Sequence, residues 1–131
     1  MAKEDSENFS ITNKTKGKHP SLPFVKIKNE ILGRKFDLSL VFIGNNLSRK
    51  LNRIYRGKDK SANILSFHLT KNSGEIFINL AVAKIEAKKQ GESFRNYVWF
   101  ILIHGMLHLK GMRHGSKMNI AERKFRIKFD L

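Results

Sequence analysis

The chain has 131 residues, 40% of them hydrophobic, so we expect one domain with a buried core rather than several domains. It has no cysteine, which excludes disulfides and leaves nitrogen and oxygen ligands for any metal ion, and it has no apolar run near the roughly 20 residues of a membrane helix. Its 26 Lys and Arg against 11 Asp and Glu give a net charge of +15, which favours a polyanionic partner, although charge alone does not exclude a merely basic protein.

The first half of the chain is expected to mix strands and helices. Apolar residues that recur every three or four positions indicate helices, and alternating β-branched or aromatic residues indicate strands. Residues 1–8 are polar, lack the apolar core of a signal peptide, and are expected to form a flexible tail. We predict an edge strand at 9–12, helices at 20–32 and 45–55, a strand at 36–43, and two strands at 64–69 and 75–80 joined by a turn.

The second half is expected to be helical. One helix should cover 81–90, and Ser93 should cap a second helix that reaches Leu109. Residues 97–103 are apolar on every side of that helix, which is typical of a buried central helix, and its aromatic residues are expected in the core. A last helix is predicted at about 117–128. Together these elements indicate the α+β class, with about four strands in a small mixed sheet and about five helices.

Three histidines near the end of the central helix form the most informative pattern. His104, His108 and His114 have the spacing H-x3-H-x5-H, with Gly111 between the second and the third. The first two project from one helix face, and a turn at Gly111 would bring His114 beside them. Three His ligands with a fourth position open to water are typical of a catalytic Zn²⁺ site. Packed histidines without a metal are the alternative, and such sites also accept nickel, copper or cobalt.

The residue after the first histidine distinguishes this pattern from that of a peptidase. The spacing is that of metzincin peptidases, and hence zincin-like, but Gly105 stands where those enzymes carry a Glu that acts as general base. No general acid for an amine leaving group is evident either. Cleavage of a phosphodiester requires cations instead, and the chain is rich in them. The missing Glu and the charge balance therefore favour a phosphate substrate and disfavour a metallopeptidase.

Basic residues are concentrated at 49–60 and from Ser93 onward, where eight Lys and Arg face two acidic residues. Arg56 is the candidate catalytic residue, because a planar guanidinium can donate two parallel hydrogen bonds to a phosphate. An ordinary surface arginine at a helix end is the alternative. Polar contacts from Ser66 and Asn63 would be either to substrate or structural. Further candidates for substrate binding are Arg53, Lys58, Ser66 and Arg113.

These residues together resemble the YbeY family of single-domain, metal-dependent endoribonucleases. The family signature H-G-x-L-H-L-x-G-x-x-H stands at 104–114. A Leu-Asn-x-x-Tyr-Arg block stands at 51–56, a Leu-Ser-Phe block at 65–67, and Gly-Glu-Ile at 74–76 resembles the family's Gly-Asp-Ile strand. Met118 and Glu122 are similar to residues of its closing helix. The blocks follow one another in order across residues 36–125, which makes the resemblance specific.

The resemblance implies a function as well as a fold. It implies a zinc ion held by three histidines and a substrate-contacting arginine at Arg56. It also implies a protein that matures the 3′ end of small-subunit ribosomal RNA and acts in ribosome quality control. The length predicts one domain over residues 1–131, and the lack of a signal peptide and of a membrane helix predicts a cytoplasmic protein without membrane contacts. The alternative from the residues alone is a non-catalytic, RNA-binding ribosome-assembly factor with a structural zinc. The oligomeric state is not predicted.

The chain departs from the family pattern at three places. Arg113 replaces the usual Asp before the third histidine, which raises the local positive charge. Residues 61–63, Ser-Ala-Asn, replace Pro-Thr-Asp, and His68 replaces a Pro after the Leu-Ser-Phe block. These departures concern the substrate contacts more than the metal ligands.

Overall fold

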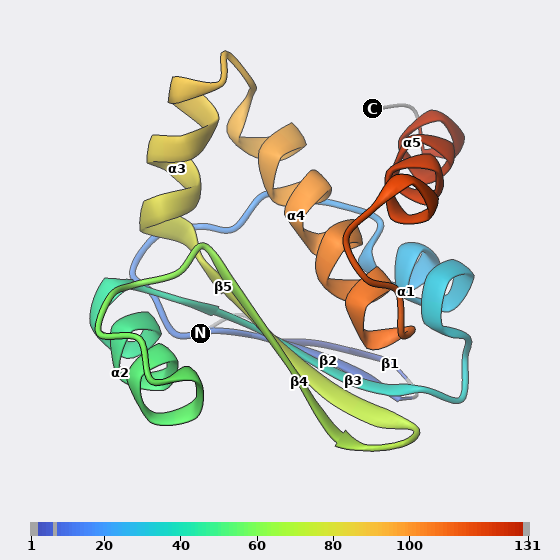
Figure 1. Ribbon diagram of the computed structural model, residues 1–131, viewed down its shortest axis with the longest axis horizontal. Coiled ribbons are helices and arrows are strands. Elements are labelled where there is room, and N and C mark those ends of the chain that lie inside the picture. Colours follow the sequence, from blue (N-terminus) through green and yellow to red (C-terminus); the bar gives the residue numbers. More distant parts are fainter. Residues whose placement is uncertain (1–2, 7, 130–131) are drawn as a thin grey trace.

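The computed structural model describes residues 3–6 and 8–129, in an α+β arrangement (Figure 1). Its sheet has five strands in the order β1-β2-β3-β5-β4, one more than expected. The inner pairs β2–β3 and β3–β5 are parallel, and the outer pairs β1–β2 and β4–β5 are antiparallel. The strands are β1 (Lys3–Ser6), β2 (Phe9–Asn13), β3 (Asp37–Ile43), β4 (Ile64–Thr70) and β5 (Ser73–Asn79).

Strand β1 lies where the sequence suggested only a flexible tail. Its polar residues carry no apolar alternation, and backbone pairing with β2 places them in the sheet. As a result β2 is an inner strand, not the edge strand expected from its sequence. Residues 1, 2 and 7 of the expected tail lie outside the described residues.

Five helices are present in the described part of the chain, as expected. They are α1 (Phe24–Leu32), α2 (Asn45–Arg56), α3 (Leu80–Lys89), α4 (Phe94–Leu109) and α5 (Ser116–Lys128). Helix α1 begins four residues later than predicted, because Pro23 restricts Leu22 to extended conformations and itself stands at the N-cap. Among the described residues, no helix is long and apolar enough to cross a membrane.

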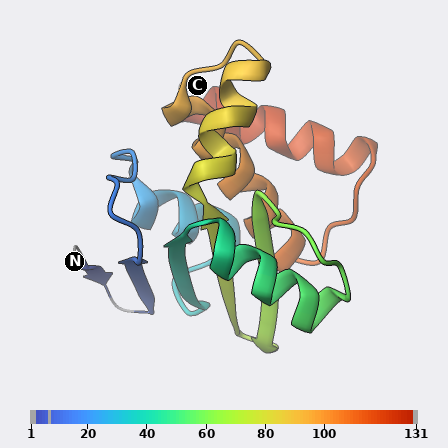
Figure 2. The same ribbon diagram turned by 90° about the vertical axis from the view of Figure 1, so that its left-hand side faces the viewer.

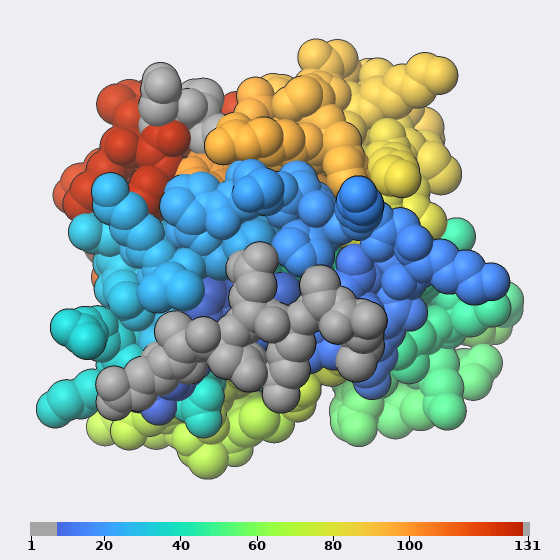
Figure 3. Space-filling model, turned by 180° about the vertical axis from the view of Figure 1, so that it is seen from behind, coloured from blue at the N-terminus to red at the C-terminus, as the bar shows by residue number. Residues whose placement is uncertain are grey.

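The sheet separates two unequal layers. Helices α1, α3, α4 and α5 lie on one side of it and α2 lies on the other (Figures 1 and 2). Side chains of β3 alternate accordingly: Leu38, Leu40 and Phe42 belong to the main core with α4, whereas Val41 and Ile43 face away from that core. Behind the main core, the segment that leads from β2 into α1 covers the molecule between α5 and α3 (Figure 3).

Helix α4 is the centre of the main layer. The Ser93 hydroxyl accepts a hydrogen bond from the backbone N–H of Asn96 at 3.0 Å, which is the N-cap that the sequence predicted. The helix packs against α1, α3, α5 and the outer strand β4. Most of its apolar side chains are buried, Phe94 and Phe100 only partly, and a fully buried one contributes about 1.5–3 kcal/mol by leaving water. The helix therefore holds its polar residues on a rigid base.

Candidate metal centre

The three histidines converge at the C-terminal end of α4. His104 and His108 lie one turn apart on the helix, and His114 lies in the turn before α5. Gly111 makes that turn possible with φ 104°, a conformation that glycine adopts without strain. The three ring centroids are 4.7 to 4.8 Å apart. One ring nitrogen from each histidine lies within 4.8 Å of the others, so the group could hold a metal ion.

Hydrogen bonds fix which ring nitrogens face the centre. His104 Nδ1 hydrogen-bonds to Glu122 Oε1, and His108 Nδ1 to the carbonyl oxygen of Met112 at 3.1 Å. Since a carboxylate and a carbonyl only accept, both rings carry the proton on Nδ1 and a lone pair on Nε2. The two Nε2 atoms lie 3.2 Å apart. Two nitrogens bound tetrahedrally to zinc at about 2.0–2.1 Å would be about 3.3–3.4 Å apart, so the donor set fits such an ion.

The environment of His108 favours its neutral form. Burial lowers the pKa of His108, and the nearby rings of His104 and His114 and the guanidinium of Arg56 lower it further, whereas the hydrogen bond to the Met112 carbonyl opposes the shift. An imidazole that stays neutral keeps the lone pair that a metal ion requires.

Glu122 is a site residue to which the sequence reasoning assigned no role. It comes from α5, lies 18 positions after His104, and is only 7% exposed. Its carboxylate orients the His104 ring, as carboxylates commonly do for metal-binding histidines. Nothing in the local sequence connects the two residues, because only the packing of α5 against α4 brings them together.

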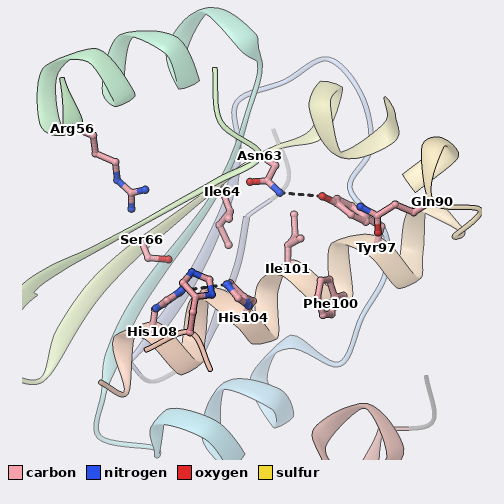
Figure 4. A pocket seen from close by; sticks show the side chains of 12 residues that line it. Arg56, Asn63, Ile64, Ser66, Gln90, Tyr97, Phe100, Ile101, His104 and His108 are labelled. Carbon is pink, nitrogen blue, oxygen red and sulfur yellow. Dashed lines mark hydrogen bonds between the residues drawn. The ribbon is translucent and has the colours of Figure 1, made fainter. Parts of the chain in front are cut away.

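A cleft of about 670 Å³ opens beside the histidines (Figure 4). One wall is α4, and the opposite wall is the outer strand β4. Arg56 stands at the end of α2, and its side chain points toward the histidines from the far side of β4 (Figure 4). The lining residues are Arg56, Asn63, Ile64, Ser66, Gln90, Tyr97, Phe100, Ile101, His104, Gly105, His108 and His114.

Gly105 lies close to β4 within this cleft. A Cβ atom there would lie 2.7 Å from Ile64 Cδ1 and 3.0 Å from Ser66 Oγ. A side chain at this position would therefore require the Ile64 and Ser66 side chains to shift.

The residues predicted to bind substrate do not all line the cleft. Ser66 lines the main cleft with Arg56, and Lys58 lines a neighbouring pocket of about 340 Å³ that also includes Arg56. Arg53 lies 3.7 Å from the Asp59 carboxylate and lines neither pocket. Arg113 is exposed in the turn before His114 and also lines neither.

The other end of the cleft contains residues that the sequence had placed in the core. Tyr97 is buried at 4% exposure as expected, yet its hydroxyl accepts a hydrogen bond from Asn63 Nδ2 at 3.0 Å and faces the cleft. Phe100 was also expected in the core, but it is half-buried and lines the cleft. It lies on the cleft side of α4, between Tyr97 and His104 in the sequence. Because residues 97–103 are uniformly apolar, the sequence does not show which of them face the cleft.

Comparison with known proteins decides the family. The family described as "Endoribonuclease YbeY" matches residues 3–127 of the chain. The chain belongs to the YbeY family. A relative from Staphylococcus carnosus named "Endoribonuclease YbeY" is 35% identical over 115 residues, which cover 79% of this chain and 72% of that protein. One of the same name from Phytoplasma mali is 38% identical over 103 residues, covering 72% and 70%.

This chain spans only part of the length of some relatives in the YbeY family. The match to the protein from Geobacillus kaustophilus, 34% identical over 96 residues, covers 62% of this chain and 62% of that protein. A solved structure, TM1509 from Thermotoga maritima, superposes with a TM-score of 0.63 at 24% identity and covers 89% of this chain and 85% of that one. This similarity supports the α+β fold.

Proposed function

We propose that this protein is a zinc-dependent endoribonuclease of the cytoplasm that matures the 3′ end of small-subunit ribosomal RNA and takes part in ribosome quality control. Its relatives carry the name "Endoribonuclease YbeY". The observation that carries the proposal is the cleft itself: three histidines that can hold a metal ion and an arginine share one cavity. The net charge of +15 matches an RNA partner.

Each cleft residue has a role that follows from its chemistry. His104, His108 and His114 would hold the zinc ion, and Glu122 and the Met112 carbonyl keep two of these rings in the tautomer that binds it. A zinc ion supplies Lewis-acid chemistry, which activates water and offsets phosphate charge.

Arg56 makes no ion pair with a carboxylate among residues 3–6 and 8–129, so its guanidinium is available to a phosphate that enters the cleft. It would donate paired hydrogen bonds to the phosphate oxygens and hold the phosphodiester against the histidines. The Ser66 hydroxyl lies on the β4 wall of the cleft and can donate one more hydrogen bond to the phosphate. Lys58, in the neighbouring pocket, would hold the next part of the RNA backbone.

Two other functions fit parts of the structure. A non-catalytic RNA-binding assembly factor would use the same basic surface with a structural zinc. A metallopeptidase fits less well, because Gly105 stands where metzincin peptidases carry the Glu that acts as general base.

Mapping of RNA ends with purified protein tests the proposal. A small-subunit RNA with an extended 3′ end is incubated with zinc-loaded protein, with chelator, and with chelator followed by added zinc. We expect cleavage only when zinc is present. His108→Ala should lose both the metal and cleavage and keep most of its RNA affinity, whereas His68→Ala removes an exposed histidine outside the cleft and should cut normally. Binding without cleavage, weakening with salt at a log–log slope near −0.7 per phosphate contacted, would instead identify an assembly factor.

A further inference from the structure

We infer that the end of the cleft away from the histidines is a nucleobase subsite that selects the nucleotide next to the cut phosphodiester. The inference rests on the proposed function, because it assumes that the phosphate lies beside the histidines and Arg56. It assigns a specificity role to Asn63, Tyr97 and Phe100, with Gln90 at the rim.

The length of the cleft leaves room for one nucleoside beyond the phosphate. Tyr97 and His104 are both on the cleft side of α4, seven positions apart, which at 1.5 Å per residue separates them by about 10 Å along the helix. This length is comparable to the reach of a nucleotide from its phosphate to the far edge of its base. The cleft volume of about 670 Å³ is also within the range of small-ligand sites.

The walls between these two ends are apolar and suit the faces of a base. Ile64 on β4 and Ile101 on α4 stand on opposite sides, and the Phe100 ring lies beside them (Figure 4). Phe100 is held in place by the guanidinium of Arg126, which lies 5.5 Å from its ring centroid. A fixed aromatic ring at the edge of a cleft offers stacking to any base that enters.

The far end offers polar groups that the protein leaves unused. Tyr97 accepts the hydrogen bond from Asn63 Nδ2, so its hydroxyl proton is free to be donated. The Asn63 side-chain oxygen is an acceptor next to it. Within the described residues neither group makes another hydrogen bond. A donor beside an acceptor, at the end of an apolar slot, is the arrangement that reads the Watson–Crick edge of an unstacked base.

Substrates with a single altered base test the subsite. Each base that flanks the mapped cleavage site is replaced in turn by the three others and by an abasic ribose. We expect one flanking position at which removal of the base lowers kcat/KM about tenfold to a hundredfold. Asn63→Ala and Tyr97→Phe should lower kcat/KM about tenfold for the base-containing RNA and leave the abasic RNA unaffected. Gln90→Ala, at an exposed position, tests the same subsite without disturbing the core, and Asn119→Ala on α5 is the matched control.

A second readout separates this inference from the proposed function. Wild-type protein is titrated with the four nucleoside monophosphates and with ribose 5-phosphate, and NMR signals of Asn63 and Tyr97 are followed. Base-dependent shifts without RNA cleavage would support the subsite and contradict the nuclease. Cleavage that is equal for abasic and base-containing RNA, or variants that slow both equally, would overturn the subsite and leave the nuclease intact.

Discussion

Glu122 of helix α5 hydrogen-bonds to Nδ1 of His104 on helix α4, across the contact between the two helices. The carboxylate is 7% exposed, and His104 is its hydrogen-bond partner among the described residues. A buried carboxylate costs free energy unless it is paired, and a bound cation behind the imidazole would complete the pairing. The stability of α5 and the binding of a metal ion would therefore be linked through one hydrogen bond.

Glu122→Gln should change metal affinity and metal-free stability in different directions. The amide oxygen can still accept from His104, but the charge that strengthens the ligand is lost, so we expect zinc affinity to fall about 10- to 100-fold. The metal-free protein should be as stable as the wild type or more stable, because a buried charge is removed. Competition with a chromophoric chelator and denaturant unfolding measure the two quantities. Glu92→Gln, which alters the pairing with Arg126 instead, is the control. Unchanged zinc affinity in Glu122→Gln would contradict the link.

Arg56→Ala should lower catalysis without loss of metal. If Arg56 holds the phosphate, its removal should reduce kcat/KM by about 10²–10³, the effect of losing one transition-state donor, while zinc content stays the same. Arg56→Lys should recover only part of the rate, because an ammonium does not donate two parallel bonds. Arg53→Ala on the same helix removes an equal charge that lies outside the cleft and beside Asp59. An equal loss in both variants would reduce Arg56 to a contributor to general charge.

The local sequence was sufficient to predict the central helix and its histidines. Ser93 as the cap, the uniformly apolar turns and the His spacing are signals within one element, and backbone geometry translates them directly into positions in space. The hairpin of β4 and β5 was also predicted from local strand and turn signals, and the fold class from the mixture of predicted helices and strands.

The remaining features depend on packing between elements. Lys3–Ser6 joins the sheet by backbone pairing with β2, and its polar sequence shows no alternation that would predict a strand. The hydrogen bond from Asn63 to Tyr97 spans 34 positions, and Arg56 lines the cleft although α2 lies on the other side of the sheet, next to the edge strand β4. No periodicity in one segment encodes such relationships. The chemistry of the guanidinium and the family resemblance both indicated Arg56, but neither could give its position relative to the histidines.

Gly105→Ala should destabilise the protein, although alanine is normally the better helix former by about 1 kcal/mol. The added Cβ would lie 2.7 Å from Ile64 Cδ1, and such overpacking typically costs about 1–3 kcal/mol. The double variant Gly105→Ala with Ile64→Val removes that Cδ1 atom and should recover part of the loss. Denaturant midpoints of the wild type, of Gly105→Ala, of Ile64→Val and of the double variant provide the measurement. A gain in stability from Gly105→Ala alone would contradict the prediction and show that the Ile64 side chain shifts aside at little cost.

Asp59→Asn should destabilise the protein near neutral pH and have no effect in strong acid. Arg49 donates hydrogen bonds of 2.9 and 3.0 Å to the two Asp59 oxygens, which ties helix α2 to the loop that carries Lys58 and Lys60. These hydrogen bonds lower the pKa of Asp59, as do the charge of Arg49 and, to a smaller extent, that of Arg53, while desolvation opposes the shift.

A carboxyl group whose pKa is lower in the folded state stabilises that state above its unfolded pKa of about 3.9, and this contribution is lost as the pH falls through the folded value. The difference between the denaturation midpoints of wild type and Asp59→Asn should therefore be positive at pH 7 and vanish once the pH falls below the folded-state pKa of Asp59. Both residues are exposed, so the difference should also shrink as salt is added. Asp37→Asn, at a carboxylate without an ion pair in the described chain, should show neither dependence. A difference between wild type and Asp59→Asn that persisted in strong acid would place the role of Asp59 in packing rather than in its charge.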